Sequence, residues 1–145
     1  MHKYIINHQC VFNEQQNELR NVSNSLVIKM TAMRANCLRF MIEHAERGII
    51  DRQALTNELW GERGKYVNDA NLTQMIYLIR KDLKAIGISD LLVTVPRRGI
   101  QVNSGIAIEK VEITHRSTPP HASLAKPIIV TLCILLLIAA CLYFI

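Results

Sequence analysis

The stretch Asn68–Gly87, NDANLTQMIYLIRKDLKAIG, decides the fold of this chain. Its apolar residues Leu72, Ile76, Ile79 and Leu83 follow one another at intervals of four, three and four, so a helix places them all on one stripe. Either of the first two residues can cap such a helix, and the final glycine ends it. The sequence therefore predicts a helix to about residue 86 that buries one narrow stripe.

Most of the side chains that lie off this stripe are polar, and one is aromatic. They include Asn71, Thr73, Gln74, Tyr77, Arg80, Lys81 and Lys84. Amide, hydroxyl and guanidinium groups on an exposed helix are typical of a helix that reads the DNA major groove. An ordinary solvated helix has a similar composition, so the pattern alone leaves both interpretations open.

A β-hairpin with a basic tip is predicted after this helix. Leu92–Val95 is a candidate strand, Pro96–Gly99 a turn, and Ile100–Val102 the returning strand. The turn carries two adjacent arginines, Arg97 and Arg98. Two arginines at a hairpin tip suit a phosphate backbone or a narrow minor groove.

Upstream of the long helix, the sequence predicts a small antiparallel sheet and two shorter helices. The apolar strips of the sheet are Tyr4–Ile6, Cys10–Phe12 and Leu26–Lys29. Thr31 can cap a helix that runs to about Ala45, and Asp51 can cap a second helix from Arg52 to Trp60.

Together these segments resemble the winged helix-turn-helix domain of OmpR/PhoB-type response regulators, and most of all its membrane-tethered ToxR and CadC branch. The residues that carry the resemblance are Leu59, Trp60 and Gly61, then Leu72, Ile76, Ile79, Arg80, Lys81 and Leu83, then Thr94, Val95, Pro96, Arg97, Arg98 and Gly99. The resemblance covers residues 4–103 and implies an α+β fold. In that fold an N-terminal antiparallel sheet is followed by three helices and a C-terminal hairpin wing.

The resemblance also implies which residues meet the partners. In the third helix they are Asn71, Thr73, Gln74, Tyr77, Leu78, Arg80 and Lys81, with Arg80 and Lys81 on the phosphates. In the wing they are Thr94, Arg97 and Arg98. The loop expected to contact RNA polymerase comprises Glu62, Arg63, Gly64, Lys65 and Tyr66.

Two residues depart from the family pattern in ways that bear on function. Leu78 stands where relatives often carry a polar or basic groove residue, which predicts a different specificity and a lower affinity. Ile100 stands where an aromatic residue is common, which predicts weaker packing of the wing.

The segment Ile128–Ile145 reads IIVTLCILLLIAACLYFI and contains no charge, Gly or Pro. As a helix it would be about 27 Å long, close to the hydrocarbon thickness of about 30 Å. We therefore expect a single transmembrane helix at 127–145, rather than a buried helix of a larger soluble core, after a flexible linker at 104–126 and a winged-helix domain at 1–103. Within the linker, Ile106–Ile113 alternates weakly and leaves a short strand open.

Composition narrows the class of partner. The 145-residue chain has a formal net charge of +5, and residues 62–102 carry seven basic against four acidic side chains. An anionic partner is therefore expected, either nucleic acid or anionic lipid. The four cysteines and five histidines show no metal-ligand or catalytic spacing, so we expect no cofactor, no metal and no enzymatic activity.

We thus expect a DNA-binding transcription regulator of the bacterial inner membrane, with its N-terminal domain in the cytoplasm and without an extracytoplasmic sensor domain. Its expected partners are double-stranded DNA, RNA polymerase, the membrane, a second copy on DNA and a membrane partner protein. Two rival hypotheses stay open. One is a winged helix that modulates another regulator by protein contact, and the other is a basic domain that binds anionic lipid.

Overall fold

The computed structural model describes residues 2–112, which belong to one compact unit. No helix formed by these residues is both long and apolar enough to cross a membrane. The predicted transmembrane segment 127–145 lies outside the described residues, as does the part of the predicted linker from residue 113 onward.

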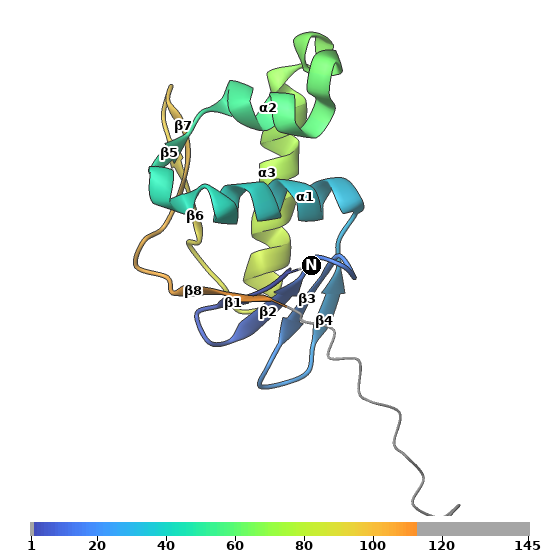
Figure 1. Cartoon of the computed structure of the whole chain (residues 1–145), viewed down its shortest axis with the longest axis vertical. Helices are drawn as coiled ribbons and strands as arrows, with labels where there is room; N and C mark the ends of the chain where they lie inside the picture. Colours follow the sequence, from blue (N-terminus) through green and yellow to red (C-terminus); the bar gives the residue numbers. More distant parts are fainter. Residues whose placement is uncertain (1, 113–145) are drawn as a thin grey trace, which may run out of the picture. The chain divides into compact units, whose positions relative to one another are not determined.

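A five-stranded antiparallel sheet forms the base of the domain (Figure 1). Its strands are β1 (His2–Ile6), β2 (Cys10–Asn13), β3 (Glu18–Asn21), β4 (Val27–Lys29) and β8 (Ile108–Glu112), in the spatial order β4-β3-β2-β1-β8. Alternation along β1 and β2 buries Tyr4, Ile6, Cys10 and Phe12 on the inner face. The predicted N-terminal sheet is confirmed, and β3 adds a strand that the apolar strips did not mark.

Strand β8 is the short strand that the sequence left open within the predicted linker. Residues 108–112 were assigned to a flexible segment with a short strand left open, whereas the structure pairs them with β1 from His2↔Glu112 to Ile6↔Ile108. The physical reason is that β1 would otherwise leave a row of unpaired N–H and C=O groups at the edge of the sheet. The pairing is extended by the Asn7 N–H, which donates to the Ala107 carbonyl at 2.7 Å.

The helices begin where the predicted caps lie. They are α1 (Ala32–Glu43), α2 (Arg52–Trp60) and α3 (Asp69–Ala85), with short 3-10 turns η1 (Ala45–Arg47) and η2 (Gly61–Tyr66) after the first two. The side chains of Thr31, Asp51 and Asn68 each accept a hydrogen bond from a backbone N–H in the first turn of their helix. The capping predictions are therefore confirmed.

A second, three-stranded sheet forms the wing. Its strands are β5 (Ile49–Ile50), β6 (Leu92–Val95) and β7 (Gly99–Val102), in the order β5-β7-β6. The predicted hairpin β6–β7 is confirmed. Strand β5 was not predicted, and it anchors the base of the wing through the pairs Ile49↔Gln101 and Ile50↔Ile100.

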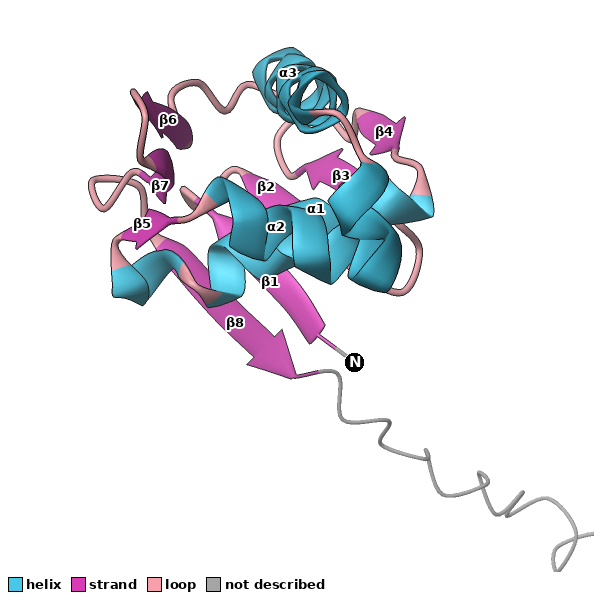
Figure 2. Cartoon of the chain, turned by 90° about the horizontal axis from the view of Figure 1, so that it is seen from above, coloured by secondary structure: helices cyan, strands magenta, loops and turns pink. Residues whose placement is uncertain are grey.

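The core lies between the large sheet and the helices (Figure 2). The predicted stripe of α3 is confirmed, because Leu72, Ile76, Ile79 and Leu83 are all buried there. An ion pair between Arg34 of α1 and Asp82 of α3 fixes the two helices at the rim of this core.

Gly99 is the residue at which the wing base is least tolerant of change. Its φ is +151°, and a Cβ added there would overlap the carbonyl oxygen of Ile50. We predict that Gly99→Ala lowers the free energy of unfolding by about 2–3 kcal/mol, because backbone must move to relieve the overlap. Urea denaturation followed by circular dichroism measures this change.

Gly105→Ala is the matched control, since its Cβ would meet only the movable side chain of Asn103. Equal stability of the two variants would contradict the prediction.

Candidate nucleic-acid interface

One face of α3 is open to solvent along most of the helix. Asn71, Gln74, Tyr77 and Lys81 are exposed, while Leu78 is half-buried. Tyr77 is the most prominent aromatic group on this face, with 58% of its surface exposed. Of the side chains that the sequence assigned to the major groove, the structure leaves Asn71, Gln74 and Tyr77 in solvent together, whereas Leu78 is partly covered.

Thr73 has a partner on the neighbouring helix. Its hydroxyl accepts a hydrogen bond from Nη2 of Arg52 at 2.8 Å, and Nε of the same arginine donates to Asp69 at 2.7 Å. Arg52 thereby joins the start of α2 to the start of α3. Sequence reasoning missed Arg52, because a contact across 17 to 21 residues has no local signature.

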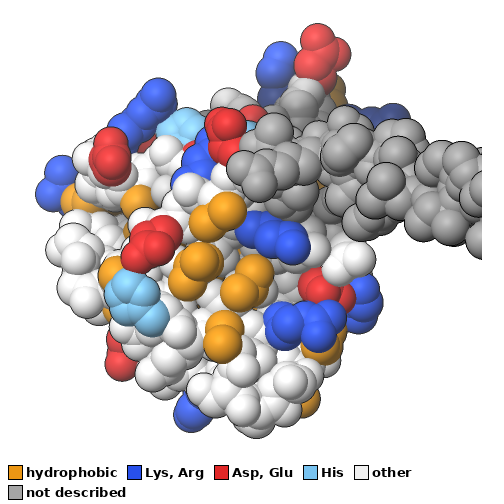
Figure 3. Space-filling model, turned by 60° about the horizontal axis from the view of Figure 1, so that its bottom comes forward, with side chains coloured by type: hydrophobic (Ala, Val, Ile, Leu, Met, Phe, Trp, Pro, Cys, Tyr) orange, Lys and Arg blue, Asp and Glu red, His pale blue; other side chains and the backbone are white. Residues whose placement is uncertain are grey.

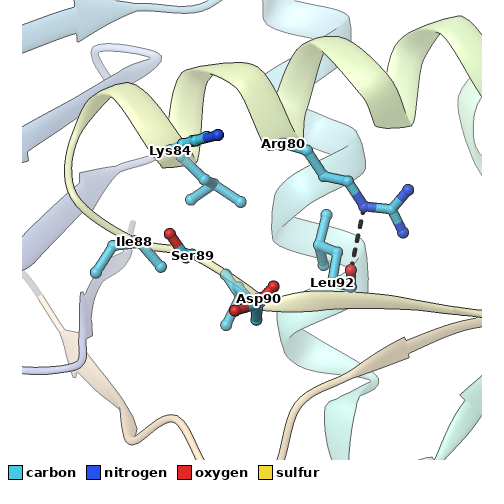
Figure 4. A pocket seen from close by; sticks show the side chains of 8 residues that line it. Arg80, Lys84, Ile88, Ser89, Asp90 and Leu92 are labelled. Carbon is cyan, nitrogen blue, oxygen red and sulfur yellow. Dashed lines mark hydrogen bonds between the residues drawn. The ribbon is translucent and has the colours of Figure 1, made fainter.

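Arg80 connects α3 to the wing. Its Nε donates to the Leu92 carbonyl at 3.1 Å, and its Nη2 donates to the Thr94 hydroxyl at 2.7 Å. Figure 4 shows the side chain reaching from α3 toward β6, at the edge of a cavity of about 420 Å³ that Lys84 and Ser89 also line. Burial lowers the pKa of Arg80, but an arginine stays charged at any physiological pH. We call this pair of contacts the Arg80 bridge.

The tip of the wing is an exposed turn. The Arg98 N–H donates to the Val95 carbonyl at 3.1 Å, and Arg97 adopts a left-handed backbone with φ +60°. Both arginine side chains are exposed, and within residues 2–112 neither forms an ion pair with an acidic side chain. The tip therefore presents two positive charges that no neighbouring carboxylate neutralises.

The predicted polymerase-contact loop is the turn η2. Glu62, Arg63, Lys65 and Tyr66 are exposed there, and Tyr66 has 90% of its surface in solvent. Gly64 is buried, because its backbone lies against the side chain of Thr56. In Figure 1 this green turn follows α2 at the end of the domain opposite the large sheet.

Hydrophobic side chains gather on the outer face of the large sheet (Figure 3). The strand register aligns Ile5, Val11, Arg20 and Val27 in one row across the sheet, and the three apolar members are only half-buried. Val111 of β8 adds an exposed side chain to this face. Its chemistry differs from that of α3 and the wing, and it suits contact with protein better than contact with DNA.

Comparison with known proteins places this geometry in a family. Residues 25–102 match the family model described as "Transcriptional regulatory protein, C terminal". The chain is 31% identical to the YqeI protein of Escherichia coli over 129 residues, which are 87% of this chain and 47% of that protein. It is 28% identical to the cholera toxin transcriptional activator of Vibrio cholerae over 120 residues, which are 82% of this chain and 41% of that protein. The chain thus spans less than half the length of either relative.

Solved structures show the same fold. The DNA-binding domain of Escherichia coli CadC superposes with a TM-score of 0.58 at 21% identity, covering 68% of this chain and 90% of that one. The AdeR DNA-binding domain, solved in complex with an intercistronic region, gives 0.55 at 17% identity over 66% of this chain and 94% of that one. Both solved structures are named as DNA-binding domains, and the Vibrio cholerae relative is named as a transcriptional activator.

The Arg80 bridge predicts that Thr94 limits the motion of the wing. A hydrogen bond to a charged donor contributes about 1 kcal/mol at a partly exposed site, so Thr94→Val should speed amide exchange at Val95, Arg97 and Arg98 about fivefold. Hydrogen exchange followed by NMR on the full-length chain in detergent measures this rate. Thr94→Ser keeps the hydroxyl and should exchange as the parent does. A wing that exchanges equally in all three proteins would show that the bridge does not hold it.

Proposed function

We propose that this chain regulates transcription from a bacterial inner membrane. The premise is that it belongs to the winged-helix family of OmpR/PhoB-type transcriptional regulatory domains. In this proposal α3 enters the major groove of a promoter, and the wing meets the adjacent minor groove. The C-terminal apolar segment holds the domain beside the membrane, with the domain in the cytoplasm.

The observation that carries the DNA-binding part is the Arg80 bridge. It holds β6 beside α3, so the exposed face of the helix and the two unneutralised arginines of the wing tip form parts of one surface. Electrostatic contact with phosphates supplies most sequence-independent affinity, and groups on the helix supply selectivity.

The proposed roles follow from exposure and chemistry. Asn71, Gln74 and Tyr77 contact base edges, since amide groups pair well with adenine and an aromatic ring packs against the thymine methyl. Lys81 contacts phosphates. Leu78 offers only apolar contact, which favours selectivity for thymine methyl groups and a modest affinity.

Membrane anchoring rests on the sequence of Ile128–Ile145 and on the basic residues Arg116 and Lys126 that precede it. Basic residues on one side of an apolar span favour a cytoplasmic location for that side. Two anchored copies confined beside a membrane would bind tandem half-sites more readily, because confinement raises the effective concentration of the second copy. The turn η2, with its exposed Tyr66, is the proposed contact for RNA polymerase.

The apolar row on the outer face of the large sheet favours a second candidate function. Ile5, Val11 and Val27 could contact another regulator at the membrane while α3 binds nothing. Gel-shift measurements on the full-length chain separate the two functions, because this second candidate predicts no retention of DNA even at low ionic strength. Co-sedimentation with anionic and with neutral liposomes tests the lipid-binding alternative, which predicts stronger retention by the anionic ones.

The wing should control the salt dependence of DNA binding. Four to six phosphate contacts imply a log–log slope of about −4 to −5, and each arginine that neutralises a phosphate accounts for about −0.9 of it. We predict that replacing Arg97 and Arg98 with Ala weakens binding to every sequence and flattens the slope by about 1.8 units. Fluorescence anisotropy at several salt concentrations measures both effects.

Arg47→Gln removes the same kind of charge from the exposed turn η1 and serves as the control. An unchanged slope in the double variant would refute the wing assignment.

The anchor should depend on the apolarity of its centre. An arginine at the middle of a transmembrane helix costs about 2.5–3.5 kcal/mol of insertion free energy. We predict that Leu136→Arg moves much of the chain from the carbonate-resistant membrane pellet to the soluble fraction, whereas Leu136→Val leaves it in the pellet. Recovery of the parent protein from the soluble fraction would rule out the anchor.

A further inference from the structure

We infer that two copies of this chain pair through strand β8, antiparallel to one another, with Val111 opposite the same residue of the second copy. The inference deepens the proposed function, because it names the surface through which two membrane-anchored copies meet. It rests on the proposed anchor, which confines both copies beside one membrane. We call this arrangement the β8 pair.

The outer edge of β8 has free backbone groups. β8 ends the sheet order β4-β3-β2-β1-β8, and no strand of the described residues pairs with its outer side (Figure 2). The Asn7 N–H donates to the Ala107 carbonyl, and these two residues lie opposite one another in the register of β1 and β8. Hydrogen-bonded pairs alternate along an antiparallel ladder, so the backbone groups of Val111 point toward β1, and those of Lys110 and Glu112 point outward. A further strand can therefore pair with β8.

Charge selects a single register for a second copy. In a twofold antiparallel pair one residue lies opposite itself, and the residues before and after it lie opposite one another. A pair centred on Glu109, Lys110 or Glu112 places two like charges directly opposite, which is destabilising. A pair centred on Val111 places Lys110 opposite Glu112 on both sides of the centre. Among the exposed residues 109–112, Val111 is therefore the only centre at which opposite charges meet.

The direction of the backbone hydrogen bonds agrees with this register. Lys110 and Glu112, whose backbone groups point outward, become the pairs that exchange N–H···O=C bonds. Val111 becomes a pair without such bonds, in which the Cα atoms lie about 4.5 Å apart and the side chains approach most closely. The Val111 side chain is 42% exposed and lies on the outer face of the sheet, opposite Lys3 of β1. Pairing would cover this apolar group with its counterpart.

A second copy fits this edge better than an unrelated strand. Lys110 and Glu112 lie one residue to either side of Val111, so the edge is complementary to itself. The Lys110 ammonium lies 3.9 Å from Glu43 of its own chain, and 47% of its side chain stays exposed to meet a partner. Because the contact is short, we expect it to form where anchoring raises the local concentration of copies, and not in dilute solution.

The symmetry of the β8 pair constrains how it meets DNA. Rotation about a twofold axis relates the two α3 helices, so the pair suits inverted half-sites. Tandem half-sites repeat in one direction, and the two members of such a pair cannot occupy both. Cooperative binding to tandem half-sites therefore requires the β8 pair to separate.

Disulfide cross-linking in proteoliposomes tests the register. The protein is the full-length chain with Val111→Cys, and with Cys133→Ala and Cys141→Ala to remove the thiols of the apolar segment. Burial raises the pKa of the Cys10 thiol to about 11 and that of Cys37 to about 12, so both stay protonated and resist oxidation. Cα atoms about 4.5 Å apart lie within the range that a disulfide spans, so mild oxidation should yield a covalent dimer on a non-reducing gel.

Glu109→Cys, in the same background, is the matched control on the same strand and face. In the β8 pair the two copies of residue 109 are offset by about 13 Å along the strand, so this variant should cross-link at least about tenfold more slowly. Equal rates for the two cysteine variants would indicate random collision and would overturn the inference.

Charge exchange tests the partner. Added to the Val111→Cys protein, Lys110→Glu or Glu112→Lys places like charges opposite one another on both sides of the centre and should slow cross-linking about tenfold. The double variant restores opposite signs and should recover the original rate, which neither an unrelated partner nor a change in folding would produce. A double variant that stays slow would contradict the β8 pair. Circular dichroism checks that each variant is folded.

A DNA measurement tests the twofold geometry. The parent protein in detergent selects a duplex from a random library, and gel shifts then compare one copy of that site with two tandem copies. Reduced Val111→Cys protein should bind the tandem duplex cooperatively, and its oxidised dimer should lose that cooperativity until a reductant is added. An oxidised dimer that keeps the cooperativity would overturn the register.

Failure of the inference and failure of the proposed function are distinguishable. If the parent retains DNA while Val111→Cys does not cross-link in proteoliposomes, the β8 pair is refuted and the proposed function stands. If the parent retains no DNA, the proposed DNA-binding function fails, and the cross-linking rates still decide whether the β8 pair forms.

Discussion

Burial of one stripe of α3 is the constraint on which the rest of the domain depends. Leu72, Ile76, Ile79 and Leu83 are each no more than 2% exposed. Full burial of an aliphatic side chain contributes about 1.5–3 kcal/mol, so together these four residues fix the rotation of the helix about its axis. That rotation in turn decides which side chains of α3 project to solvent. The candidate DNA-binding surface is therefore a consequence of core packing.

Features that depend on neighbours in sequence could be predicted from sequence alone. The caps at Thr31, Asp51 and Asn68, the extent of α3 and the wing hairpin were all inferred from patterns within one helical turn or one strand, and the structure confirms them. Such patterns suffice because a cap bonds to a backbone N–H two or three residues away. The same holds for the exposed residues of α3, which follow from the position of the stripe.

Features that depend on distant residues could not be predicted. The weak alternation of Ile106–Ile113 left a short strand open, but the pairing of β8 with β1, at the opposite end of the described residues, has no local signature. Strand β5 has only two residues. The contact that positions the wing joins Arg80 to a backbone carbonyl at Leu92, and a carbonyl is present at every residue. Arg80 was assigned to phosphates by resemblance, and the structure adds a bridging role that no sequence pattern encodes.

The distribution of charge explains how a chain with a net charge of only +5 suits a polyanionic partner. Several arginines away from the wing are neutralised within the domain, since Arg20 pairs with Glu18, Arg34 with Asp82, and Arg39 with acidic groups of one turn and two helices. Paired charges largely cancel beyond the screening length of about 10 Å at 0.1 M salt. The arginines of the wing tip, which form no such pair within residues 2–112, therefore keep their charge available to a partner. Net charge understates the attraction for DNA in a protein of this kind, because what a partner meets is the charge of one surface.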